Sequence, residues 1–129
     1  IVPIALLSDN LTALKEIGQA VALSIKESGK EKSTLIVASS DMTHYESQAE
    51  AQKKDNEAIR AILDLDEDKL LEKIMRLHIS MCGYAAVIAM LSAAKMLGAK
   101  KSALVMYQTS GDVTGDKSSV VGYAGIIIS

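Results

Sequence analysis

The stretch that most constrains the fold of this chain is Leu35–Tyr45, with the sequence LIVASSDMTHY. Its first five residues are apolar or small and partly β-branched, which is typical of a buried strand. The residues that follow bring polar groups, among them Asp41 and His44, into the next loop. Because ligands of open α/β sheets bind just beyond the carboxyl ends of the strands, this loop is the first candidate for a functional site.

The rest of the pattern predicts a single α/β domain over residues 1–129. The apolar run Ile1–Leu7 predicts another strand, and apolar residues from Leu11 to Ile25 recur at the spacing of a helix. A strand, a helix and the strand Leu35–Ser39 in this order predict a right-handed crossover and a parallel pair. Three helices and two strands are expected next, and these last strands could pair as a hairpin. They cover residues 47–63, 66–78, 84–97, 103–107 and 120–128.

Composition and charge exclude several classes of protein. With 14 basic and 16 acidic residues the net charge is -2, so nucleic acid is not an expected partner. The longest apolar stretch, Tyr84–Leu91, is too short to cross a bilayer, and no membrane association is expected. A single cysteine, Cys82, cannot form an internal disulfide, which favours a reducing cytoplasm. The apolar start at Ile1 suggests a fragment whose missing part lies on the N-terminal side.

Asp41 and His44 are the first residues that could carry chemistry. They are three positions apart, so a tight loop or a first helical turn would turn both side chains to one side. A carboxylate beside an imidazole can orient it as a base or share a metal ion with it. Helix capping explains Asp41 equally well, because an aspartate at a strand end commonly caps the next helix.

Cys82 and His78 form a second candidate pair. Four positions separate them, and on one helical face an imidazole and a thiolate would suit a soft metal, although Gly83 makes a continuous helix doubtful. A lone histidine on an apolar face is more often a core residue, and cysteine is commonly buried. The loop Gln108–Asp116 lacks the signatures of a P-loop or an EF-hand, and we expect a polar surface loop that could form a wall of the same cleft.

Four segments in order resemble the second half of Memo-family proteins. This family includes the B component of the AmmeMemoRadiSam set and is similar in fold to class III extradiol, non-haem iron dioxygenases. The resemblance implies a three-layer fold with a mostly parallel or mixed sheet flanked by helices, of which this chain would be the C-terminal part and an incomplete domain. The segments are Ser39–Tyr45, His78 with Met81–Gly83, Tyr107–Asp112 and Ser119–Gly125.

The same resemblance implies roles for four residues. His44 and Asp41 match the loop histidine and carboxylate of the family, and in the related dioxygenases the histidine acts as an acid or base, so we take both as catalytic candidates. Cys82 matches a cysteine that stands where those dioxygenases have a carboxylate metal ligand, and His78 matches a histidine of the same motif. We take Cys82 and His78 as metal candidates. The family's other metal-site histidines come from its N-terminal half.

Two functions follow from this. The first is a Memo-like protein with a metal-binding cleft, holding iron, copper or zinc; the thiolate of Cys82 favours copper(I) or zinc, so dioxygenase turnover is not expected from this chain alone. The second is a non-catalytic module that binds a protein or peptide in a vestigial cleft. The expected partner is a small molecule or peptide. Apolar faces left bare in a fragment would drive association into a homo-oligomer or with a companion N-terminal chain.

Overall fold

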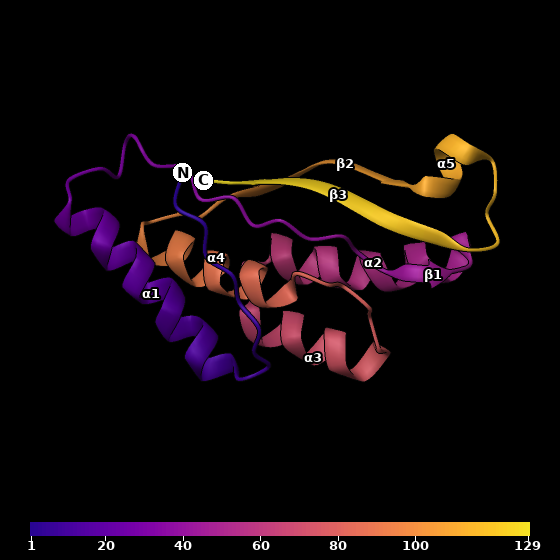
Figure 1. The fold of residues 1–129 in the computed structure, drawn as a ribbon, viewed down its shortest axis with the longest axis horizontal. Coiled ribbons are helices and arrows are strands. Elements are labelled where there is room, and N and C mark those ends of the chain that lie inside the picture. Colours follow the sequence, from indigo (N-terminus) through magenta and orange to yellow (C-terminus); the bar gives the residue numbers. More distant parts are fainter.

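All 129 residues are described by the structure, a computed structural model. Figure 1 shows two layers, with the long helices gathered on one side of a three-stranded sheet. These helices are α1 (Leu11–Glu27), α2 (Gln48–Leu63), α3 (Glu67–Leu77) and α4 (Tyr84–Met96). None of them combines the length and the apolar character that a membrane span requires. The prediction of an α/β protein is confirmed.

Local capping signals set the starts of three helices. The side chains of Asn10, Ser47 and Asp66 each accept a hydrogen bond from a backbone N–H in the first turn of α1, α2 and α3. Two glycines with positive φ, Gly29 and Gly98, follow the ends of α1 and α4, where an L-residue would be strained. The four predicted helices are therefore confirmed within one or two residues at most ends.

The sheet is antiparallel and has the strand order β1-β3-β2. Its strands are β1 (His44–Glu46), β2 (Ser102–Thr109) and β3 (Val120–Ile128). The predicted hairpin between the last two strands is confirmed. Two short elements were not predicted: β1 itself, and α5 (Ser110–Thr114), a helical turn inside the connection that was expected to be a loop.

The hydrophobic core lies between α4 and the elements around it. Ile88 and Leu91 of α4, Leu14 of α1 and Leu70 of α3 are fully buried. The backbones of α1 and α4 approach closely at Gly18, where a Cβ atom would lie 2.2 Å from the carbonyl oxygen of Ala89. With seven buried residues, α4 is the central helix of this core.

The predicted parallel strand pair is wrong. Ile1–Leu7 and Leu35–Ser39 are not strands, and the sheet that the structure contains has no parallel pair, so the mostly parallel sheet is not found. Leu35 and Val37 are 83% and 75% exposed. An apolar run becomes a buried strand only when neighbouring strands pair with its backbone and a second layer covers its side chains, and these two runs have no such neighbours.

Candidate metal centre

Three of the residues singled out in the sequence form a cluster. One potential ligand atom each from Asp41, His44 and Cys82 lies within 4.8 Å of the other two. Asp41 and His44 lie where the extended segment enters β1, and Cys82 lies in the turn just before α4. Asp41 and His44 are partly buried, while Cys82 is exposed, so solvent reaches the cluster from the sulfur side.

The imidazole of His44 is held in a defined orientation. Its Nδ1 lies 2.7 Å from the carbonyl oxygen of Ser80, and its backbone N–H donates to Ser80 Oγ at 2.7 Å. A carbonyl oxygen can only accept, so Nδ1 carries a proton, and in the neutral ring Nε2 then presents its lone pair. Nε2 lies 3.6 Å from Oδ2 of Asp41, inside the cluster. This is the arrangement in which a backbone carbonyl orients a metal-binding histidine.

The sulfur of Cys82 is tied to the same loop. The backbone N–H of Asp41 donates to Sγ at 3.3 Å. Ser40 links the two segments again, because its hydroxyl accepts from the N–H of Gly83 at 2.8 Å. A Cβ atom on Gly83 would lie 2.4 Å from the carbonyl oxygen of Ser39, so only glycine allows this approach.

Behind the cluster, a buried carboxylate anchors the segment that carries His44. Asp55 of α2 is fully buried and accepts hydrogen bonds from the Thr43 N–H at 2.9 Å and from the Tyr107 hydroxyl at 2.7 Å. Burial, together with this hydrogen bond and the Asp55 charge, raises the pKa of Tyr107. Gly122 leaves room for the carboxylate, since a Cβ atom there would lie 2.0 Å from Asp55 Oδ2.

The sequence reasoning missed this anchor. Six residues of α2 are buried, and one of them is Asp55. The signal was present in the spacing: Asp55 follows Ala51 by four positions and precedes Ala58 by three, so it lies on the apolar stripe and must be buried with it. A charged residue on an apolar stripe calls for partners, which here are Thr43 and Tyr107.

The ordinary alternatives for the candidate residues are wrong. No helix follows Asp41 directly, so it is not a helix cap, and Cys82 is not buried. His78 is neither a core residue nor a member of the cluster. It is exposed, in the left-handed conformation with φ of 51°, at the position that ends α3. The structure therefore brings Asp41, His44 and Cys82 together and leaves His78 outside.

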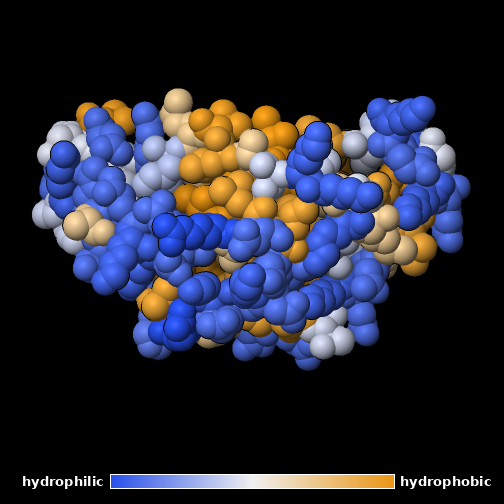
Figure 2. All heavy atoms as spheres, turned by 180° about the vertical axis from the view of Figure 1, so that it is seen from behind, coloured by the Kyte–Doolittle hydropathy of each residue, from blue (hydrophilic) through white to orange (hydrophobic).

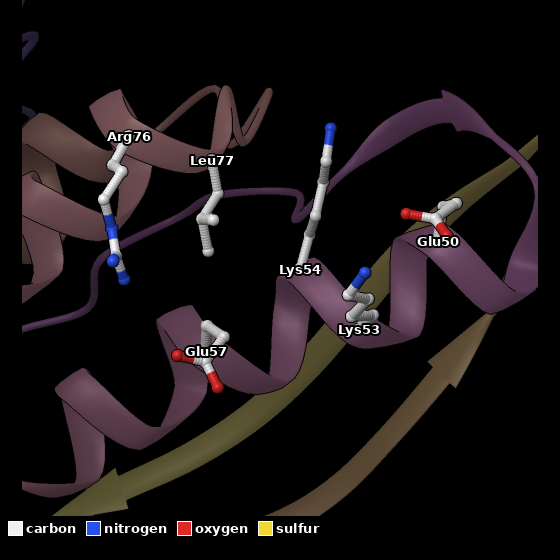
Figure 3. Close-up of a pocket in the computed structure, with 6 residues that line it drawn as sticks. All are labelled: Glu50, Lys53, Lys54, Glu57, Arg76 and Leu77. Carbon is white, nitrogen blue, oxygen red and sulfur yellow. The ribbon is translucent and has the colours of Figure 1, made fainter.

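A hollow between α2 and α3, elsewhere on the surface, differs in chemistry from the cluster. Its volume is about 250 Å³, and five of its six lining side chains are charged (Figure 3). Three of these charges have partners: a hydrogen bond from Lys73 lowers the pKa of Glu57, Lys54 pairs with Glu46, and Arg76 pairs with Glu72. The hollow contains no histidine or cysteine. Those lining it are Glu50, Lys53, Lys54, Glu57, Arg76 and Leu77.

The loop Gln108–Asp116 packs on the start of α2 rather than joining the cluster. The amide of Gln48 donates to Asp112 Oδ1 at 2.8 Å. The other oxygen of Asp112 accepts from the N–H of Thr109 at 2.7 Å, closing a capping box on α5. These contacts lower the pKa of Asp112, with the hydrogen bond from the Thr109 backbone as the main cause. The carboxylate is thus used to hold the loop in shape.

Comparison with known proteins gives a consistent result over nearly the whole chain. A family model described as "Memo-like protein" matches residues 1–127. A MEMO1 family protein of Methanocaldococcus jannaschii is 48% identical over 128 residues, which cover 99% of this chain and 44% of that protein. One of Methanosarcina acetivorans is 46% identical, covering 99% and 47%. One of Nitrosopumilus maritimus is 44% identical, covering 98% and 44%. The chain spans less than half the length of these relatives.

Proposed function

The chain belongs to the Memo-like protein family, and we propose that its Asp41–His44–Cys82 cluster is a metal-binding centre. The observation that carries the proposal is the convergence of three different donor atoms from two segments about forty positions apart, with the His44 ring oriented by Ser80. The cluster is open to a ligand, since Asp41 is only partly buried and Cys82 is exposed.

The donor set suits a soft or borderline ion. A thiolate, an imidazole and a carboxylate are the ligands of zinc, whereas magnesium and calcium prefer oxygen alone. Ligands held tetrahedrally at roughly 2.0–2.3 Å from zinc lie roughly 3.3–3.8 Å apart, and the 3.6 Å between His44 Nε2 and Asp41 Oδ2 fits this spacing. Three protein ligands leave a fourth position for water or another ligand. We therefore place zinc and copper(I) ahead of iron(II) for this centre.

The family relationship also supports a three-layer, dioxygenase-like fold for the arrangement in which these 129 residues function. Helices cover one face of the sheet, and the other face carries exposed apolar side chains, among them Val105, Met106 and Ile127. Figure 2 shows a broad hydrophobic area in the upper half of the molecule, the half that holds the sheet in Figure 1. An apolar face of this kind is usually covered by another layer.

Cobalt(II) provides the direct test, because it takes zinc sites and its bond to a thiolate absorbs in the near ultraviolet. Titration of the purified chain is expected to give this charge-transfer band at one equivalent. Cys82→Ser should abolish the band, and His44→Gln should weaken cobalt binding at least about tenfold. His78→Gln is the matched control and should leave both unchanged. A missing band, or one that survives Cys82→Ser, would contradict the proposal.

The choice among metals has its own test. Elemental analysis of the chain after purification under anaerobic conditions with iron(II), and separately with zinc, should show zinc retained and iron retained weakly or not at all. Stoichiometric, tightly held iron would overturn this order. Oxygen uptake with catechols is not expected, and uptake that His44→Ala abolishes would restore the dioxygenase alternative.

A second candidate function, binding of a polypeptide without turnover, is favoured by a separate observation. An apolar groove of about 740 Å³ runs along the extended segment and reaches Ser40 and Met42, next to the cluster. Its size and lining suit a chain segment better than a small polar molecule.

A further inference from the structure

The apolar groove lies between two stretches of extended backbone. One wall is the segment of residues 34–40, and the other is the last part of β3, residues 124–128. Its floor is made by side chains of α2 and α4, among them Ile62, Val87 and Met90. Most of the lining side chains are hydrophobic.

The two walls begin as paired neighbours and then separate. The Met42 N–H donates to the Gly122 carbonyl oxygen at 2.9 Å, and the Gly122 N–H donates to the Thr43 carbonyl oxygen at 2.9 Å. His44 then pairs with Val121 within the β1–β3 ladder. The backbone groups of residues 34–40 make no hydrogen bond with the backbone of any other part of the chain. β3 pairs with β2 along one edge only, so its other edge beyond Gly122 is also unpaired.

Residues 35–40 are alternately exposed and partly buried, which is the pattern of an extended chain with one side against the protein. Backbone N–H and C=O groups of an extended chain change side with each residue, so residues two apart point the same way. Met42 directs its N–H at β3, and Ser40, Ala38 and Ile36 therefore direct theirs toward the same side. Each wall thus offers a row of donors and acceptors that another extended chain can pair in register.

We propose that the groove is a slot for one β-strand, supplied by the part of a Memo-like polypeptide that lies outside the region matched by this chain. More than half of each relative lies outside that region, since the aligned part is 44–47% of its length. A strand in the slot would pair with both walls and place its apolar side chains on Ile62, Val87 and Met90. The mode of recognition is strand addition, in which main-chain hydrogen bonds supply affinity and pockets supply specificity.

A second copy of this chain is the competing occupant, through its exposed segment Ile1–Leu7. Pro3 argues against it. A strand held between two others needs donors on both edges, and proline has none, which confines it to edge strands or strand starts. The slot is therefore assigned to a heterologous segment. This assignment does not depend on metal binding at the cluster.

The experiment reconstitutes the slot from two chains. This chain is co-expressed with the portion of the Methanocaldococcus jannaschii relative that lies outside the aligned region, and the product is purified and sized by light scattering. Hydrogen exchange of the Ile36, Ala38 and Ser40 amides is then compared with that of this chain alone. We expect a 1:1 complex in which these amides exchange at least about 100-fold more slowly.

One position tests the pairing itself. Ala38→Pro removes the N–H that faces the slot, and Ala38→Ser keeps both the N–H and the approximate size. We expect Ala38→Pro to weaken the complex at least about tenfold and Ala38→Ser to leave it within about twofold. In this chain alone the Ala38 N–H has no partner, so the proline should not prevent folding. If Ala38→Pro does prevent folding, the amide exchange rates of the unsubstituted chain in the complex test the proposal instead.

Three results would overturn the proposal. The first is a complex in which the three amides exchange as fast as in the free chain. The second is a homodimer of this chain that protects the same amides without the second polypeptide, which would assign the slot to another copy. The third is the absence of any complex when both chains are soluble and folded.

Discussion

The two ends of Leu35–Glu46 have very different surroundings, although both contain large apolar residues. At the downstream end, Met42 and Thr43 are 3% and 0% exposed, held by β3 and by Asp55. At the upstream end, Leu35 and Val37 are 83% and 75% exposed. Composition does not explain the difference, because the upstream end is the more apolar of the two. Strand pairing explains the difference in exposure, because the end that pairs with β3 is the buried one. The candidate metal cluster lies at this paired end.

The largest expected effect concerns packing that does not depend on this segment. Leu91 of α4 is fully buried in the core. Leu91→Ala should lower the free energy of unfolding by about 2–5 kcal/mol, through lost burial and the cavity left behind. Urea denaturation followed by circular dichroism measures this. A loss below about 1 kcal/mol would mean that the helical layer is as loosely packed as the upstream end.

The next effect tests what holds the paired end in place. Asp55→Ala leaves the Thr43 N–H and the Tyr107 hydroxyl without their partner. We expect a cost of about 1–3 kcal/mol, mainly from the Thr43 N–H, because Thr43 is fully buried. Loosening Thr43 should also disorder His44, so cobalt binding should weaken with stability. Tyr107→Phe is the control, because it removes only one of the two hydrogen bonds and leaves Thr43 held. Equal cobalt affinity in Asp55→Ala and the unsubstituted chain would show that this anchor does not position the cluster.

The Tyr107 control carries a pH dependence of its own. Its pKa is raised in the folded state above the ordinary tyrosine value of 10.0, so the folded chain holds a proton that the unfolded chain releases. The stabilising contribution is fully present below pH 10 and is lost as the pH rises above it. Unfolding free energies measured at pH 8 and pH 10.5 should fall more steeply for the unsubstituted chain than for Tyr107→Phe. Parallel slopes would contradict the buried hydroxyl–carboxylate contact.

A smaller effect is expected far from the segment, at the start of α3. The Asp66 side chain accepts from the Lys69 N–H at 2.9 Å, and this hydrogen bond is the main reason why the Asp66 pKa is lowered. Asp66→Ala should cost about 1 kcal/mol at pH 7. Because the folded pKa is depressed, this contribution is present above the unfolded value, near 3.8, and is lost as the pH falls through the folded pKa.

The matched control is Asp64→Ala. Asp64 is 62% exposed at its side chain and reaches Lys69 Nζ only at 3.7 Å, so its loss should change stability by less than about 0.5 kcal/mol. Thermal unfolding at pH 7 and at pH 3 separates the two variants: the difference between Asp66→Ala and the unsubstituted chain should shrink in acid. A difference that stays constant would exclude capping by the ionised carboxylate.

Local signals were enough to predict the helices, and non-local pairing was not. Asn10, Ser47 and Asp66 mark helix starts within one turn, which the sequence displays directly. β1 has three residues and exists only because β3 lies beside it, seventy-odd positions later, which no local window reveals. The prediction of a parallel pair was wrong because an apolar run shows only that a segment could be a buried strand. It does not show whether a neighbouring strand is present to pair with it.

The candidate site divides in the same way. Spacing alone placed Asp41 beside His44, whereas Cys82 joined them through the family resemblance and then through contacts with Ser40 and the Asp41 backbone. His78 failed as a partner of Cys82 because α3 ends at Leu77 and the left-handed backbone at His78 turns the chain away from the helical direction. A four-residue spacing predicts a shared face only when one helix spans both residues.

The smallest expected effect sharpens the contrast most, because it applies the same substitution as Leu91→Ala to the unpaired end. Leu35→Ala should change the stability of this chain by less than about 0.5 kcal/mol, since the side chain is already 83% exposed. In the complex with the complementary portion of the relative, Leu35 would gain strand neighbours, and the same substitution should then cost more than about 1 kcal/mol. Chemical denaturation of both forms gives the two values. A large cost in the free chain would mean that the upstream end already has a partner within these 129 residues, whereas a negligible cost in both forms would leave the burial of this segment, and the strand slot beside it, without support.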